Sequence, residues 1–207
     1  MRYLYIDTSS SYLYTSIVEE GKVVSEIKEE YGQSLSKVAL PRIVSMFEYN
    51  NLKPTDIDKI IVVNGPGSFT GIRIGLTIAK VYAWSLDIPI TTILSLEAMA
   101  ISSNKDKIHV PLIDARRGYV FTAIYDNSGN EVLKPCHIKL TELMEKLDRI
   151  DNYEFISNDE FEEIEVESYS PDFLKIVNKY KDKKKVNPHM VNPEYLKLTE
   201  AEEKKHD

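Results

Sequence analysis

Hydrophobic and polar positions alternate with two distinct periods over the first ninety residues of this chain. Short apolar runs rich in β-branched and aromatic residues predict strands at Tyr3–Asp7, Tyr12–Val18, Val23–Glu30, Lys59–Val63 and Ile90–Leu94. Apolar residues spaced by three and four predict two helices, Ser34–Asn50 and Ile72–Leu86. Pro41 lies inside the first helix and indicates either a kink or a later start. The predicted order is therefore β-β-β-α-β-α-β.

A glycine-rich segment joins the strand that ends at Val63 to the helix that follows. It runs from Asn64 to Gly75 and lies at the carboxyl end of a strand, where open α/β sheets usually place ligands or partners. A P-loop would need a lysine at Ile72, and glycines at 65, 67 and 71 do not have the spacing of a dinucleotide-binding fingerprint. Two interpretations stay open: a tight structural turn, or an anion-binding loop that uses Gly67, Ser68 and Thr70.

The helix predicted over Ile72–Leu86 is apolar on nearly every side. One face is a stripe of small residues on which another helix could approach closely: Gly71, Gly75, Ala79 and Ala83. Because such a helix must be covered all round, we expect one side to lie on the chain's own sheet and the rest to contact a second protein. An ordinary core helix is the alternative. We expect Arg73, in the first turn, to meet a carboxylate or phosphate. The residues predicted at the partner interface are Leu35, Ala39, Ile43, Phe47, Ile72, Arg73, Leu76, Ala79, Lys80, Ala83 and Trp84.

The start of the second half of the chain is similar in sequence to the start of the first. Residues Ile6–Glu19 align without a gap on Ile113–Asp126, at an offset of 107 residues, with identical Ile, Asp, Tyr, Thr and Ile positions. Chance similarity is the alternative to a true repeat. A repeat implies a duplicated α/β fold in which each half opens with a hairpin and an aspartate, Asp7 or Asp114. Later patterns predict helices at Leu140–Leu147 and Phe173–Tyr180 and a strand at Tyr153–Ser157. No second glycine loop follows, so the second copy is reduced, and we expect subdomains at residues 1–100 and 101–207.

Composition and charge restrict the function. A chain of 207 residues with 43% hydrophobic residues can bury a real core, and its net charge of −7 argues against a free-standing nucleic-acid binder. A role on RNA would then need a basic partner.

The single cysteine, Cys136, cannot form an intrachain disulfide. The absence of a signal peptide or an apolar run of about 18 residues predicts a cytoplasmic protein without membrane contact. The histidines are too scattered for a metal motif, so we expect no metal site: His109, His137, His189 and His206. The charged segments Lys183–Lys185 and Glu200–Asp207 are expected to be solvated.

The combined pattern resembles a known family. A duplicated chain that opens each half with a hairpin and an aspartate is similar to the actin-like ATPase (ribonuclease-H-like) fold, with mixed sheets flanked by helices. With the segment Gly65–Gly75, the resemblance narrows to the TsaB family, the small subunit of the bacterial machinery that makes threonylcarbamoyladenosine in tRNA, formerly grouped with glycoprotease-like proteins. One departure is Gln33-Ser34, where the family often has His-Ser. The supporting motifs are Ile6-Asp7-Thr8, Leu40-Pro41, Pro89-Ile90, Ser95–Ala98, Asp114–Gly118 and Pro193–Lys197.

The resemblance implies a noncatalytic scaffold or activator. Members of the family dimerise, through two long helices of the first half, with a larger catalytic homologue, TsaD, and the free subunit pairs with itself through the same surface. The resemblance further implies that the P-loop ATPase subunit TsaE joins through the complex, that ATP or ADP binds only in the assembled complex, and that tRNA is contacted only indirectly. No catalytic residue and no cofactor are expected for the isolated chain. Asp7, Gly67, Ser68 and Thr70 are weak phosphate candidates.

Two other classes of function stay open. The first is an independent enzyme of the actin-like fold, either a small-molecule kinase or a glycoprotease-like peptidase, and it would use Asp7 or Asp114 near a phosphate. Neither Ser68 nor Ser95 lies in a hydrolase motif, and Asp7 fits equally well as a cap on turn amides. The second is a purely structural homodimer, because an apolar helix indicates that a partner covers it but does not identify that partner.

Overall fold

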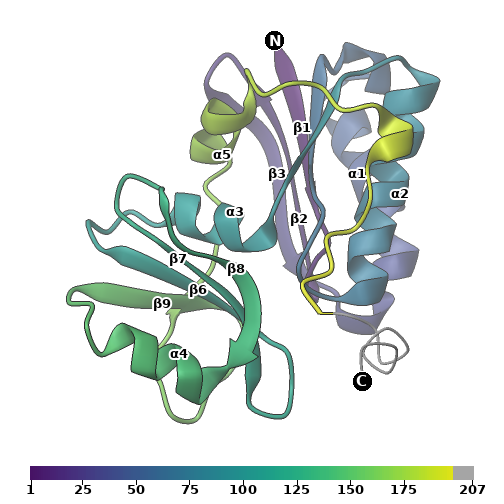
Figure 1. The fold of residues 1–207 in the computed structure, drawn as a ribbon. Coiled ribbons are helices and arrows are strands. Elements are labelled where there is room, and N and C mark those ends of the chain that lie inside the picture. The colour runs from purple at the N-terminus through teal and green to yellow at the C-terminus, as the bar shows by residue number, and fades with distance from the viewer. Residues whose placement is uncertain (198–207) are drawn as a thin grey trace.

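The computed structural model describes residues 1–197 and has two lobes, each built around a five-stranded sheet (Figure 1). The strand order is β3-β2-β1-β4-β5 in the first sheet and β10-β9-β6-β7-β8 in the second. The first sheet contains β1 (Arg2–Asp7), β2 (Tyr12–Glu19), β3 (Lys22–Glu30), β4 (Lys59–Val63) and β5 (Ile90–Ile93). The second contains β6 (Ile108–Asp114), β7 (Tyr119–Tyr125), β8 (Glu131–Lys139), β9 (Tyr153–Ser157) and β10 (Glu167–Ser168). Both sheets mix antiparallel and parallel pairs, as the predicted fold requires.

The two sheets repeat one topology. β1 pairs antiparallel with β2 and parallel with β4, and β6 pairs in the same two ways with β7 and β9. The turns after β1 and β6 are also alike, because Asp7 Oδ1 accepts a hydrogen bond from the Ser9 amide and Asp114 Oδ1 accepts one from the Arg116 amide, both at 2.8 Å. These turns occupy equivalent places in the 107-residue repeat. The structure therefore confirms the duplicated fold.

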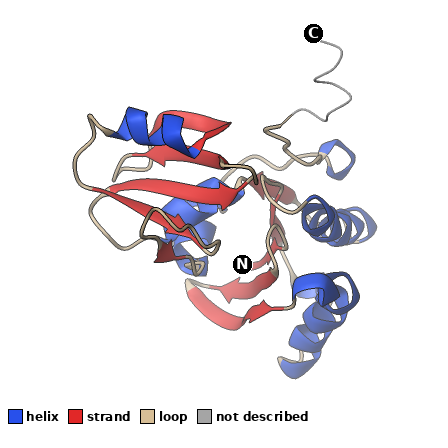
Figure 2. Ribbon diagram, turned by 90° about the horizontal axis from the view of Figure 1, so that it is seen from below, coloured by secondary structure: helices blue, strands red, loops and turns tan. Residues whose placement is uncertain are grey.

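Helices cover the two sheets on three sides, and each covered face is a separate apolar core (Figures 1 and 2). α1 (Leu35–Tyr49) and α2 (Phe69–Ser85) pack on one face of the first sheet. α3 (Ser95–Ser102) and α5 (Phe173–Tyr180) lie between the two sheets, and α4 (Leu140–Leu147) packs on the far face of the second. Short 3-10 turns occur at Gly32–Ser34, Pro54–Asp56 and Pro188–Met190. Within residues 1–197, no helix has both the length and the apolar character needed to span a bilayer.

The small residues of α2 bring this helix close to β1. A Cβ added at Gly71 would lie 2.0 Å from the Thr8 carbonyl oxygen, and one at Gly75 would lie 2.4 Å from Thr8 Oγ1. Ala79 and Ala83, further along the same face, are buried. The stripe therefore packs on the chain's own sheet, and the prediction that a second helix approaches it is wrong.

The last described residues return to the first lobe. α5 contacts β1, β2 and β3, and carbonyl oxygens at and just after its end accept hydrogen bonds from a buried lysine of β4. Lys59 Nζ donates to the carbonyl oxygens of Tyr180, Lys181 and Lys183 at 2.9, 2.9 and 2.7 Å. A cation is favourable at the carboxyl end of a helix, because unpaired carbonyl groups gather there.

Residues 186–197 form a C-terminal segment that runs along α2. Val186 pairs with Ile90, Lys80 Nζ donates to the Val191 carbonyl oxygen at 2.9 Å, and the Glu194 amide donates to the Asn64 carbonyl oxygen at 2.7 Å. Part of the region expected in the second subdomain thus completes the first lobe and covers one side of α2. The predictions for His206 and for residues 200–207 lie outside the described residues.

Candidate functional site

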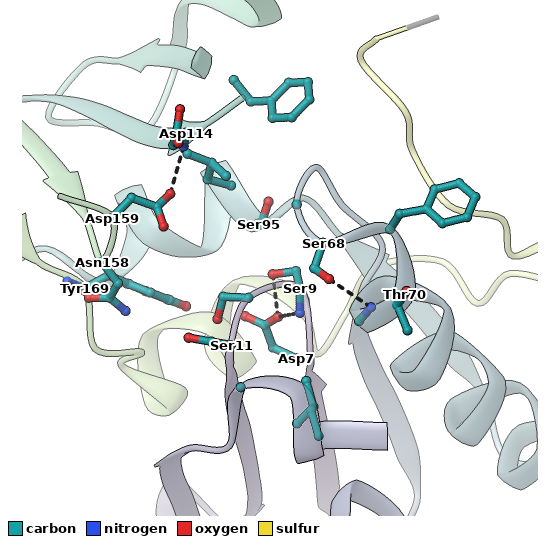
Figure 3. Close-up of a pocket in the computed structure, with 18 of the residues that line it drawn as sticks. Asp7, Ser9, Ser11, Ser68, Thr70, Ser95, Asp114, Asn158, Asp159 and Tyr169 are labelled. Atoms are coloured by element: carbon teal, nitrogen blue, oxygen red, sulfur yellow. Dashed lines mark hydrogen bonds between the residues drawn. The ribbon is translucent and has the colours of Figure 1, made fainter. Parts of the chain in front are cut away.

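A cleft of about 880 Å³ lies between the lobes, where β1 and β6 end (Figure 3). The turn after β1 and the glycine segment form one wall, and the turn after β6 forms the other. All four weak phosphate candidates line the cleft: Asp7, Gly67, Ser68 and Thr70. Asp114 and Asp159 lie across from them on the second lobe. The structure therefore brings together the residues that the sequence singled out for phosphate chemistry, but their bonding partners matter for what they can do.

Asp7 is buried at the end of β1 and holds the turn that follows. Its Oδ1 accepts hydrogen bonds from the amide and the hydroxyl of Ser9 at 2.8 and 2.7 Å, and the Tyr5 hydroxyl donates to Oδ2 at 3.4 Å. Burial raises the pKa of Asp7 above its usual value, and the hydrogen bonds from Ser9 only partly offset this effect. The explanation of Asp7 as a cap on turn amides is confirmed.

The glycine segment is shaped by its own chain. A Cβ at Gly67 would lie 2.2 Å from the Ser9 carbonyl oxygen, and one at Gly65 would lie 2.6 Å from that of Glu194. The Ser68 amide donates to the Ser9 carbonyl oxygen at 2.7 Å, and the Gly71 amide donates to Ser68 Oγ at 3.2 Å. An anion at a helix N-terminus needs such amides as donors. Because these two are already paired, the contacts favour the structural turn over the anion-binding loop.

The opposite wall of the cleft carries charges of both signs. The Asp114 amide donates to Asp159 Oδ2 at 2.8 Å, and Arg116 faces the cleft from the turn after β6. Three aspartates, Asp7, Asp114 and Asp159, outweigh this one arginine among the residues that line the cleft. Among residues 1–197, no group of three acidic, histidine or cysteine side chains is arranged to hold a metal ion. Excess negative charge opposes phosphate binding.

The residues predicted at the partner interface fall into two groups. Arg73, Lys80 and Trp84 keep positions at the surface, where Trp84 is 68% exposed. The other eight are buried in the core of the first lobe, which corrects the interface prediction for them: Leu35, Ala39, Ile43, Phe47, Ile72, Leu76, Ala79 and Ala83. The physical reason is that the most apolar stripe of each helix packs on its own sheet, so these side chains cannot contact a partner in this fold.

The exposed apolar residues of α1 and α2 lie on a different face, which sequence reasoning missed. We call Leu40, Val44, Phe69, Ile78 and Val81 the outer helix face. Four of them are strongly exposed for apolar side chains: Leu40 47%, Val44 39%, Phe69 52% and Val81 56%. A groove of about 510 Å³ runs between the two helices and is lined in part by Leu40, Phe69 and Ile78. The small stripe of α2 could have indicated which side of this helix packs on the sheet, and so which side stays accessible.

Arg73 contacts two aromatic side chains, and within residues 1–197 it forms no ion pair with a carboxylate. Its guanidinium carbon lies 3.6 Å from the centre of the Phe69 ring, and its Nε donates to the Tyr195 hydroxyl at 3.0 Å. Phe69 and Tyr195 stack with ring centres 5.4 Å apart. The three side chains connect the C-terminal segment to the start of α2, and the cation over the ring is stabilised by the ring's quadrupole.

Gln33, where this chain departs from the family that it resembles, lines the cleft.

The repeated sheet order and the two hairpins that face each other across a cleft define a protein of the actin-like ATPase fold. Two solved structures from Pseudomonas aeruginosa share it. One, described as an uncharacterized protein with similarity to peptidase YEAZ, matches with a TM-score of 0.75 and 17% identity over 95% of this chain and 99% of that one. The other, described as YeaZ, matches with a TM-score of 0.73 and 18% identity over 94% and 99% of the two chains.

Sequence comparison narrows the class to one family. The family model described as TsaD, tRNA N6-adenosine threonylcarbamoyltransferase, matches residues 22–164. The tRNA threonylcarbamoyladenosine biosynthesis protein TsaB of Bacillus subtilis (strain 168) is 33% identical over 99% of this chain and 97% of its own length. Its namesake from Escherichia coli (strain K12) is 30% identical over 64% of this chain and 58% of its own length. The chain belongs to the TsaB family.

Proposed function

We propose that this protein is a noncatalytic subunit of tRNA threonylcarbamoyladenosine biosynthesis, which activates a larger TsaD-type homologue by dimerising with it through the outer helix face. Family membership supports the place in this process, because the B. subtilis relative is named as a biosynthesis protein of that nucleoside. The match of residues 22–164 to the transferase model supports a partner of the same fold. In this proposal TsaE joins only through the complex, and ATP or ADP binds only there.

The observation that carries the proposal is the apolar surface on α1 and α2. Single exposed apolar residues are ordinary on a protein surface, but here several lie on two neighbouring helices and border one groove. The first sheet covers none of them, and the C-terminal segment contacts only Phe69, through Tyr195, although both pack against other sides of α2. A partner that buries this face gains the hydrophobic free energy that the isolated chain forgoes, about 25 cal/mol per Å² of apolar area. The free chain would bury the same face by pairing with itself.

The noncatalytic part of the proposal is supported by the bonding inside the cleft. Asp7 is occupied by Ser9, and the Ser68 amide is occupied by the Ser9 carbonyl oxygen, so two groups that could handle a phosphate serve the fold instead. The excess of acidic side chains in the cleft also supports a noncatalytic role, because negative charge opposes phosphate binding.

A binding experiment with charge substitutions tests the partner surface. Leu40→Glu and Val81→Glu place carboxylates on the outer helix face without touching the core, and Val24→Glu makes a comparable change at a 39% exposed position on the edge strand β3. We expect light scattering to give a dimer for the wild type and for Val24→Glu, and a folded monomer for the other two variants. Affinity for the TsaD-type homologue should fall at least about tenfold in the same two variants. If Leu40→Glu and Val81→Glu both remain dimers and keep their affinity for the homologue, the outer helix face is not the partner surface.

One observation supports a second candidate, an independent phosphoryl-transfer enzyme: Asp7 and Asp114 line the same cleft. Calorimetric titration with Mg-ATP and an assay of phosphate release separate the two functions. The proposed subunit shows no nucleotide turnover alone. Turnover by the pure chain that Asp7→Ala abolishes would establish the enzyme.

A further inference from the structure

Three aromatic rings form a row across β7 and β8 on the second lobe. Phe121 lies opposite His137 and Tyr119 lies opposite Lys139 in the register of the two strands. The Tyr119 and His137 rings are stacked, with centres 4.9 Å apart and planes at 12°, and Phe121 lies 5.2 Å from His137. All three are partly exposed. We call Tyr119, Phe121 and His137 the aromatic ladder.

The ladder is not explained by the packing of the lobe. Neighbouring residues that point the other way, Val120 and Ile138, pack with α4 in the core of the second lobe. None of the three described core clusters includes a ring of the ladder. Phe121 lines the interlobe cleft, so the ladder extends from the cleft onto the outer surface. Aromatic rings that stay accessible on the face of a sheet are typical of surfaces that stack planar ligands.

Cations flank the ladder although the chain as a whole is acidic. Lys139 Nζ lies 5.9 Å from the centre of the Tyr119 ring. The turn that leads into β7 carries Arg116 and Arg117, both exposed and both in the left-handed backbone region, with φ of 66° and 56°. Asp114 and Asp159 lie beside this turn, because Asp159 Oδ2 accepts a hydrogen bond from the Asp114 amide at 2.8 Å. The positive charge beside the ladder therefore comes from Lys139, Arg116 and Arg117, and the nearby carboxylates are those of Asp114 and Asp159.

From the ladder and its cations we infer that the β7–β8 face binds single-stranded RNA. A base stacks on Tyr119 in line with His137, while Lys139 and Arg117 contact the neighbouring phosphates. Aromatic side chains that stack bases, set among basic residues that follow the backbone, are the common physical basis of single-strand recognition. This inference deepens the proposed function by giving the subunit its own contact with RNA, where the family resemblance implied only an indirect one.

Fluorescence anisotropy with a labelled ten-nucleotide single-stranded RNA tests the inference on the full chain alone. We expect saturable binding at 50 mM salt that weakens strongly at 200 mM. Tyr119→Ala should weaken binding at least about fivefold, the lower range for loss of one stacked base, and Tyr119→Phe should keep it. Lys139→Glu should weaken binding and flatten the salt dependence. Matched controls are Tyr49→Ala, at an exposed tyrosine of α1, and Lys146→Glu, at an exposed lysine of α4.

Each outcome decides for or against the ladder. Retained binding in both controls, with loss in Tyr119→Ala and Lys139→Glu, supports it. No saturable binding by the wild type, equal loss in Lys146→Glu, or equal competition by a polyglutamate peptide would overturn it, the last because it would reveal a general anion surface. Circular dichroism confirms that each variant is folded. The experiment contains no TsaD-type partner, so failure of the proposed heterodimer leaves its result unaffected, and the ladder variants should still dimerise through the outer helix face.

Discussion

The two hairpin turns that face each other across the cleft come from one repeat, but they are held in different ways. The turn after β1 is clamped by the glycine segment, because the Ser68 amide bonds to the Ser9 carbonyl oxygen and Gly67 and Gly71 leave no space for a side chain. The turn after β6 has no such clamp: a Cβ at Gly118 would meet nothing within 4 Å. The same topology thus gives a fixed support in one half and an accessible surface in the other.

The largest expected difference in stability is between two glycine-to-alanine variants, one in each turn region. Gly71→Ala would drive a Cβ to 2.0 Å from the backbone oxygen of Thr8, which cannot move without shifting β1. We expect a loss of about 3 kcal/mol or more in the free energy of unfolding. Gly118→Ala meets open space and suffers only its positive φ of 74°, so about 1 kcal/mol is expected. Urea denaturation of both variants measures the difference, and equal losses would show that the first turn is not clamped.

A smaller loss of stability is expected from replacing Lys59, which holds the end of α5 on the first lobe. Lys59→Met leaves three carbonyl oxygens near the end of α5 without their donor, because Lys59 Nζ bonds to all of them. We expect a loss of about 2 kcal/mol, since hydrogen bonds from a charged donor contribute about 1.5–3 kcal/mol. Lys146→Met, on the second lobe, removes only an exposed pair with Glu142 and should cost less than about 0.5 kcal/mol. If thermal unfolding shows equal costs, Lys59 does not anchor α5.

The smallest effect has the opposite sign and depends on pH. Burial raises the pKa of Asp7, so the folded chain binds this proton more tightly than the unfolded chain, and ionisation lowers stability as pH rises. Asp7→Asn removes that loss, while its side-chain oxygen can still accept the Ser9 hydrogen bonds. We expect no gain in stability below the ordinary pKa of 3.8 and a gain that grows toward neutral pH. Asp114→Asn, on the exposed turn, is the control and should change stability little at neutral pH. A gain that does not vary with pH would contradict the assignment.

Local patterns were sufficient to predict most of the fold. Apolar runs located β1, β4 and β9, and the repeat of Ile6–Glu19 at Ile113–Asp126 predicted the duplicated sheets. These features follow from short-range periodicity and from similarity between distant segments, both of which a sequence displays directly. The return of residues 173–197 to the first lobe was not predicted, because it depends on long-range bonds such as that from Glu194 to Asn64.

The candidate site was predicted only in part. The cleft residues were found because glycines and aspartates mark the ends of strands, and Asp7, Ser68 and Thr70 do line one cleft. Eight residues predicted at an interface are buried, because apolar character alone does not tell which side of an amphipathic helix faces its own sheet. Gly71 and Gly75 carried that information, since the side of a helix without side chains is the side that can lie closest to a strand. The aromatic ladder could not be read from sequence, because Tyr119 and His137 meet only through strand pairing.

The return of residues 173–197 has a consequence for how the protein is made. Synthesis proceeds from the amino terminus at roughly 5–20 residues per second, so the ribosome releases the second lobe's strands, residues 108–168, before the segments that finish the first lobe. The nascent chain therefore carries an incomplete first lobe and a partly uncovered α2 until residues 173–197 have been synthesised. The lobe that is encoded first therefore cannot be completed until the strands of the other lobe have been made.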